Sequence, residues 1–268
     1  MKRGLERSGS VLFGLVLGSL AGLGCQGSGG DAGYLKAEEF WERKMYGLAA
    51  QTYEQFATQQ HGHPKAAQSL YKAAFIYGYY LTDYPRSVQL FHRLTALHPD
   101  SPYCLQAHRS LAETYAMRLG QYPQAIDHYR RVIELERQEG RDFSRYAYEV
   151  ARCYFLMGDS NQALEVYESI CRESPEGEFA AGAAFQIGFV RFLAEDWEAA
   201  ERGFRFLLER YPESDWTFDG MLHLASCLRK LDREKEAGRL DQQIRERFPD
   251  RAELFETKGT AGSEKRKR

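Results

Sequence analysis

The sequence contains few cysteines and none of the familiar catalytic motifs. Five of its 268 residues are cysteines, and no two of them form a Cys-x-x-Cys pair or another metal-ligand spacing. The chain has no Gly-x-Ser-x-Gly elbow, no His-Glu-x-x-His helix, no phosphate-binding loop and no dinucleotide-binding fingerprint. The missing motifs are those of common hydrolases, metalloproteases and nucleotide-binding enzymes. We therefore predict a protein that is not an enzyme and uses no cofactor.

An excess of positive charge is also absent. The chain carries 36 basic and 38 acidic residues, a net charge of −2. Removing residues 1–24 takes away three basic residues and Glu6, which leaves 33 basic and 37 acidic residues and a net charge of −4. A mildly acidic chain without a basic stripe is poorly suited to the phosphate backbone of a nucleic acid. This balance argues against nucleic acid as a partner.

The cysteines after position 25 and two nearby loop histidines lack the partners that a disulfide or a metal site needs. Cys153 and Cys171 lie toward opposite ends of two adjacent predicted helices, so they are out of register. Together with Cys104 and Cys227 they are predicted to be buried free thiols. The pair His61 and His63 has no third ligand nearby in the sequence, so we predict no metal site.

The dominant feature of the sequence is a helical repeat. Residues 142–175 have apolar positions spaced by three and four, which predicts two amphipathic helices joined by a turn at Gly158. The second helix is marked by the small Ala163 and, four residues later, the aromatic Tyr167. One such pair cannot bury its own apolar face, so copies must stack on it. Anchors equivalent to Ala163 recur at intervals of 38, 38, 38, 37 and 37 residues, and the full set is Ala49, Ser87, Ala125, Ala163, Ala200 and Ala237.

This pattern resembles the tetratricopeptide repeat (TPR). The family's Leu-Gly, Ala, Phe and Pro positions are best kept by Ile187-Gly188, Ala200, Phe204 and Pro212. The resemblance implies an all-α, right-handed superhelical TPR solenoid of about six helix pairs over residues 34–256. Counting between anchors places one extra residue in the turns of the second and third repeats. Residues 134–142 lack the usual proline and indicate either a longer helix end or a flexible joint.

In the TPR family, the first helix of each repeat lines a concave groove. Transferring those helix positions to this sequence gives a groove rich in aromatic and arginine side chains, the types that supply most binding energy at protein interfaces. We therefore expect the groove to bind protein partners, as peptide segments. The alternative is that the rings pack between repeats as additional core. The predicted groove residues are Gln68, Tyr71, Phe75, Tyr79, Arg109, Arg145, Tyr148, Arg152, Phe155, Phe185, Phe189 and Phe192.

The two ends of the chain differ from the repeats. A basic start, a short apolar run and small residues before Cys25 are typical of a secretory signal peptide over residues 1–24. The run is too short for a permanent membrane span. The site resembles that of bacterial lipoproteins, which implies that Cys25 is lipidated; because Gly22 departs from that pattern, ordinary cleavage that leaves a free thiol is the alternative. Residues 25–33 then form a flexible tether, and the polar residues 257–268 a disordered basic tail.

The lipoprotein start, the extended repeat and helix ends such as residues 97–103 and 210–216 resemble BamD-like lipoproteins of the outer-membrane β-barrel assembly machinery. That resemblance implies an outer-membrane scaffold on the periplasmic face that works with envelope assembly components. A scaffold of the Tol–Pal type and a glycan-binding accessory role are the alternatives, with a soluble periplasmic protein as the alternative location.

Overall fold

The computed structural model describes residues 30–251, and within this range the chain is entirely helical. The described range contains twelve α-helices and one π-helical turn, which confirms the predicted all-α solenoid of six helix pairs. The predicted signal peptide, Cys25, residues 25–29 of the predicted tether and the predicted tail lie outside the described residues. The elements are α1 (Ala32–Glu42), α2 (Tyr46–Gln59), α3 (Ala66–Tyr79), α4 (Tyr84–Leu97), α5 (Cys104–Thr114), η1 (Tyr115–Leu119), α6 (Tyr122–Gln138), α7 (Ser144–Leu156), α8 (Ser160–Glu173), α9 (Ala180–Leu193), α10 (Trp197–Arg210), α11 (Thr217–Lys230) and α12 (Glu234–Arg247).

The repeat anchors occupy the core in every copy. All six are at most 1% exposed, because a small side chain is needed where the two helices of a pair come closest. The aromatic residue four positions later fills the adjacent space, and Tyr53, Tyr167 and Phe204 are at most 2% exposed. In the sixth pair Asp241 stands at this position and instead binds Arg229. The phase of the repeat was therefore predicted correctly from the sequence.

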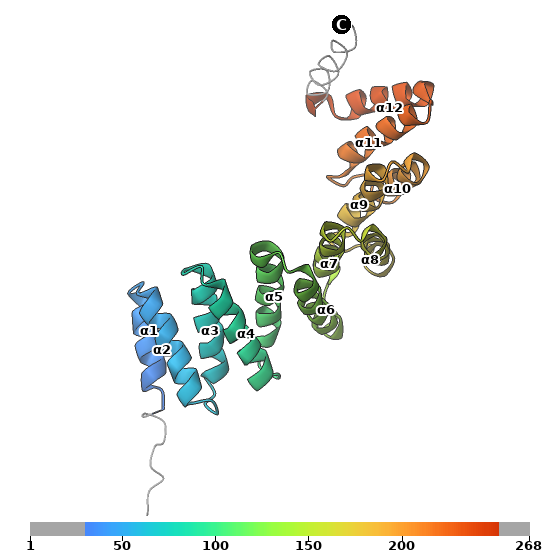
Figure 1. Cartoon of the computed structure of the whole chain (residues 1–268). Coiled ribbons are helices and arrows are strands. Elements are labelled where there is room, and N and C mark those ends of the chain that lie inside the picture. Colours follow the sequence, from blue (N-terminus) through green and yellow to red (C-terminus); the bar gives the residue numbers. More distant parts are fainter. Residues whose placement is uncertain (1–29, 252–268) are drawn as a thin grey trace, which may run out of the picture.

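The helix pairs stack in chain order, from α1 and α2 at one end of the molecule to α11 and α12 at the other (Figure 1). Extensive contacts join consecutive elements, and α9 with α11 is the main pair of non-consecutive helices in contact. The buried side chains accordingly form three adjoining clusters, over α1–α7, α7–α9 and α9–α12. This arrangement of nearest-neighbour interfaces is that of a solenoid.

The turns inside all six pairs share one backbone feature. In each of them the residue that reverses the chain between the two helices has a positive φ, the left-handed region that favours glycine. Only two of the six are glycines, so the fold imposes this conformation on four other residue types. An aspartate then caps the second helix in three pairs, where Asp83, Asp159 and Asp196 each accept a bond from a backbone N–H three residues on. The positive-φ residues are Lys44, Thr82, Gly120, Gly158, Glu195 and Asp232.

The second and third pairs carry the extra residue that the sequence predicted. In the other pairs the residue before the second helix donates its N–H to a carbonyl five residues back, as Asp159 does to Tyr154. In these two pairs the bond reaches six residues back, from Asp83 to Tyr77 and from Gln121 to Tyr115. In the third pair the added residue is accommodated by the π-helical turn η1. In the second pair α3 stays a regular α-helix, so the extra residue lies in the turn between α3 and α4.

The stretch 134–142 is a longer helix end, since α6 has 17 residues and continues to Gln138. The carboxylate of Glu136 lies at this junction, 2% exposed, where Arg109 and Arg141 both bind it.

Three of the four described cysteines are buried free thiols as predicted, whereas Cys171 is only half-buried. Among the described residues, no helix is both long enough and apolar enough to cross a bilayer.

Candidate partner-binding groove

A pocket of about 450 Å³ opens between α3 and α5, with α4 as its floor. We call it the α3–α5 pocket. The first helices of the second and third pairs supply its two walls, which is where the TPR resemblance places the concave groove. The α3–α4 turn and η1, which hold the extra residues of these two pairs, both border it. The lining residues are Phe75, Gly78, Tyr79, Thr82, Tyr84, Ser87, Phe91, Ser110, Glu113, Thr114, Met117 and Arg118.

Two stacked rings form one wall of the α3–α5 pocket. Phe75 and Tyr79 stand one helical turn apart on α3, and their ring centroids lie 5.4 Å apart at an interplanar angle of 7°. Phe75 is 37% exposed and Tyr79 is 71% exposed. On the opposite wall Met117 projects from η1 with 64% of its surface exposed. Exposed rings facing a flexible thioether are suited to holding apolar side chains of a partner.

At the floor of the pocket, α3 and α4 approach each other closely at a glycine. A Cβ atom on Gly78 would lie 2.8 Å from the hydroxyl oxygen of Ser87, so this position has no room for a side chain. The rim is polar and carries one charge of each sign, Glu113 and Arg118. The guanidinium of Arg118 lies 5.8 Å from the centroid of the Tyr84 ring. The site therefore combines an apolar platform with polar groups that can orient a bound backbone.

At the start of α3, the other predicted groove residues are less accessible. Tyr71 is half-buried and stacks on Tyr103 at 5.4 Å, and burial raises the pKa of its phenol. Gln68 is also half-buried. Tyr71 thus joins the second pair to the third, and contributes more to the interface between repeats than to an open surface.

Of the predicted groove arginines, two have intramolecular partners. Arg109 binds the buried Glu136, and its guanidinium lies 5.1 Å from the centroid of the Tyr146 ring. Arg152 lies 3.4 Å from the carboxylate of Glu149 on the same helix. Arg145 is exposed on α7. The structure therefore does not bring these arginines into one anion-binding site, and Arg109 serves to join α5 to α6.

The predicted groove residue Phe185 is a core residue, and this is a correction. It is 5% exposed and stacks on Trp216 at 4.8 Å. Phe189 and Phe192 are half-buried because His223 of α11 lies against both rings, with centroids 5.3 and 4.9 Å apart. Burial among these rings lowers the pKa of His223. In the fifth repeat, packing between repeats therefore occupies the aromatic residues.

In the fourth repeat too, packing against neighbouring helices occupies the aromatic residues. Tyr148 packs against Tyr167 and Phe179, at 5.3 and 5.4 Å, and its hydroxyl accepts a bond of 3.0 Å from Gln186. Phe155 is half-buried against the α7–α9 cluster. Of the twelve predicted groove residues, Phe75 and Tyr79 are the two that line the α3–α5 pocket.

Met117, Glu113 and Arg118 complete the pocket. The repeat count from the sequence also places Glu113 and Met117 at groove positions of the third repeat, whereas it does not place Arg118 there. Met117 is equivalent to Tyr79, and the same position in the next two repeats holds Leu156 and Leu193, which are 51% and 53% exposed. A large apolar side chain at one exposed position of four successive repeats is not required by the core.

The fold is similar to solved TPR structures. A TPR protein from Parabacteroides merdae matches with a TM-score of 0.51 and 12% identity, over 80% of this chain and 78% of that one. YrrB, a TPR protein with an unusual peptide-binding site, matches with a TM-score of 0.50 and 14% identity, over 77% of this chain and 99% of that one. The structure of Naa15/Naa10 bound to HypK-THB matches with a TM-score of 0.60 and 17% identity. That match covers 82% of this chain and 32% of the other. A comparison with curated protein sequences gives no match.

A family model supplies the sequence relationship. The model described as soluble NSF attachment protein, SNAP, matches residues 34–246. The match begins within α1 and ends within α12, so it includes all six helix pairs and the α3–α5 pocket. The chain therefore belongs to the soluble NSF attachment protein family.

Proposed function

We propose that this protein is a non-enzymatic scaffold that holds an extended segment of a protein partner in the α3–α5 pocket. The observation that carries the proposal is the coincidence of two features. Exposed apolar side chains face each other across this pocket, and the extra residues of the second and third pairs lie at its edge, in the α3–α4 turn and in the π-helical turn η1. A π-helical turn such as η1 is rare and is frequently found at functional sites.

The setting of this scaffold is the bacterial cell envelope. The signal-like start, Cys25 and the polar stretch that follows support an exported, lipid-anchored protein on the periplasmic face of the outer membrane. Within that setting, the resemblance to BamD-like lipoproteins favours a role in outer-membrane β-barrel assembly. The repeat architecture also fits a Tol–Pal scaffold, and its exposed rings also fit glycan strands.

The pocket is tested by removing its two most exposed side chains. The double variant Tyr79→Ala with Met117→Ala is expected to weaken partner binding by about 10- to 100-fold, since an interface anchor contributes on the order of 1–3 kcal/mol. Its melting temperature should stay near that of the wild type because both side chains are largely exposed. The measurement is recovery of crosslinked partners from cells, beside thermal melts of each purified variant.

Two control variants interpret that result. Leu35→Ala removes a side chain that is 59% exposed on α1, outside the pocket, and should leave partner recovery unchanged. Tyr167→Ala removes a core ring and should cost roughly 3–5 kcal/mol of stability. Unchanged recovery with the double variant would rule out the pocket. Recovery of a Tol–Pal component or of glycan strands, in place of a β-barrel assembly component, would select the corresponding alternative.

The anchor is tested separately at Cys25. The wild type should incorporate a clickable palmitate analogue and fractionate with the outer membrane, because acylation of this cysteine provides the attachment. Cys25→Ser should lose the label and become soluble in the periplasm. Label on the serine variant, or an unlabelled wild type cleaved after Gly24, would contradict lipid anchoring while leaving the α3–α5 pocket untouched.

A further inference from the structure

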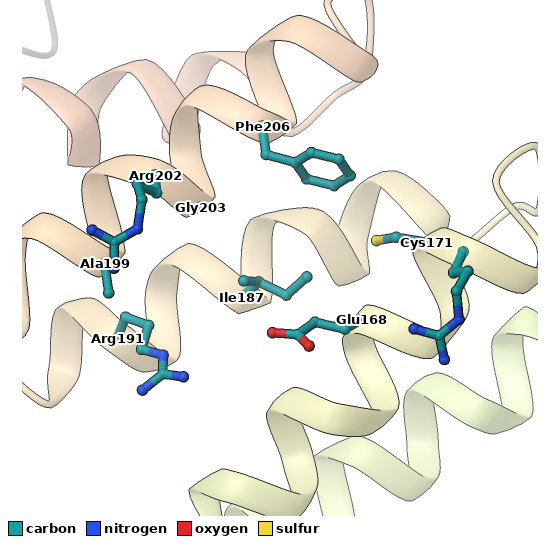
Figure 2. Close-up of a pocket in the computed structure, with 9 residues that line it drawn as sticks. Glu168, Cys171, Ile187, Arg191, Ala199, Arg202, Gly203 and Phe206 are labelled. Carbon is teal, nitrogen blue, oxygen red and sulfur yellow. The ribbon is translucent and has the colours of Figure 1, made fainter.

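A second pocket, of about 500 Å³, lies between α8, α9 and α10. We call it the α8–α10 pocket. Figure 2 shows that α8 contributes Glu168 and Cys171, that α9 contributes Ile187 and Arg191, and that Arg202 and Phe206 come from α10. The volume is within the range of ordinary ligand sites.

This pocket opens on a different face of the solenoid from the α3–α5 pocket. On α9, Ile187 and Phe189 differ by two residues, which at about 100° per residue places them about 160° apart around the helix. Phe189 belongs to the predicted groove side, against His223 of α11. Ile187 and Arg191 therefore face outward between the second helices of two successive pairs.

Positive charge is in excess around the α8–α10 pocket. Three arginines and a single carboxylate, that of Glu168, line it. Within residues 30–251, Arg191 and Arg202 form no ion pair, whereas Arg205 and Arg210 just along α10 each lie 2.8 Å from a carboxylate. Arg172 approaches Glu173 only at 3.7 Å, and that carboxylate is also bound by Arg137. The pocket thus presents guanidinium groups that have no strong internal partner.

The interior of the pocket is apolar. Phe206 is 40% exposed beside the half-buried Ile187 and Cys171. Gly203 adds no side chain, because a Cβ atom there would lie 2.7 Å from the backbone of Gly188 on α9. This close contact between α9 and α10 leaves an open apolar floor at the centre of the three arginines.

We propose that the α8–α10 pocket binds an acidic segment of a protein partner, which inserts one large apolar side chain between Ile187 and Phe206. Carboxylates on either side of that side chain pair with Arg191 and Arg202, in the fork geometry that arginine forms with carboxylates. Glu168 accepts a backbone N–H of the segment. A phosphate group offers no such donor and would meet the Glu168 charge, which favours a peptide over an anionic lipid headgroup.

The test uses two acetylated, C-terminally amidated peptides and the purified protein. One peptide places Leu-Phe between Glu-Asp and Asp-Glu, and the other replaces all four acids by their amides. The acidic peptide should bind at least tenfold more tightly by fluorescence anisotropy, and the difference should shrink with added salt. Bound peptide should also slow alkylation of Cys171, the one half-buried thiol of the four described cysteines.

Substitutions of the pocket arginines test whether the acidic peptide binds in the α8–α10 pocket. Arg191→Gln with Arg202→Gln should weaken binding of the acidic peptide at least tenfold without changing the melting temperature, since neither arginine forms an ion pair with any residue from 30 to 251. Arg239 is exposed on α12 and forms no ion pair within the described residues, so Arg239→Gln should leave binding unchanged. Equal binding of both peptides, loss of binding only in the Tyr79→Ala variant, or binding to phosphatidylglycerol vesicles without binding of the acidic peptide would each overturn the proposal.

Discussion

Replacing Glu136 with alanine is expected to lower the free energy of unfolding by about 3 kcal/mol. The carboxylate is 2% exposed and is bound by Arg109 of α5 and by Arg141 beyond the end of α6. Removing one partner of a buried ion pair typically costs 3–5 kcal/mol, because the remaining charge is left without compensation. The lower end applies here, since the two arginines are 34% and 46% exposed and solvent screens them. Urea unfolding of both proteins measures the difference.

The matched control lies two residues away on the same helix. Glu134 pairs with Arg131 at the surface, and the two side chains are 54% and 51% exposed. Glu134→Ala should therefore change stability by less than about 1 kcal/mol. If Glu136→Ala unfolds at the same urea concentration as Glu134→Ala, the buried carboxylate does not join α6 to α5 and to the segment that follows α6.

Acidification from pH 7 to pH 4 is expected to destabilise the protein through three histidines between α4, α5 and α6. Nδ1 of His108 lies 3.0 Å from Nδ1 of His128, and the ring of His92 lies 5.1 Å from that of His128. Burial, reinforced by the neighbouring histidines, lowers the pKa of His128 to about 4. Burial also lowers the pKa of His92 and of His108, and Arg131 lowers that of His108 further.

The direction of the pH effect follows because the folded protein favours the neutral form of these histidines. An unfolded histidine has a pKa of about 6.5, so the stabilisation is complete above that pH and is lost as the pH falls from about 6.5 toward 4. For His128 alone the loss approaches about 3 kcal/mol at the acid end. His128→Gln should flatten this part of the stability profile, and His61→Gln, in the exposed α2–α3 loop, should not. Parallel wild-type and His128→Gln profiles would contradict the assignment.

The sequence was sufficient to predict the repeat because its signal is local. A small anchor and an aromatic residue four positions later specify how the two helices of one pair pack, and both are visible within one window of the chain. The extra residue of the second and third pairs could also be counted. Its accommodation as the π-helical turn η1 could not, since a turn and a helix end can absorb an insertion equally well.

The groove was predicted less well because its accessibility depends on residues from the next repeat. Phe189 is covered by His223, which is 34 residues further along the chain, and Arg109 is bound by Glu136. Periodicity places a side chain on a face of its helix, but it does not show what a later helix lays against that face. The α8–α10 pocket was not predicted for the same reason, because the sequence does not show that arginines from three different helices surround one pocket.

The nearest-neighbour stacking described above also determines how the molecule responds to force. When the two ends of such a stack are pulled, every interface bears the same load, so the interfaces act as springs in series and their compliances add. A small change of angle at each junction then produces a large change in end-to-end distance. A scaffold built in this way can lengthen or shorten between two attachment points while each of its helix pairs stays folded.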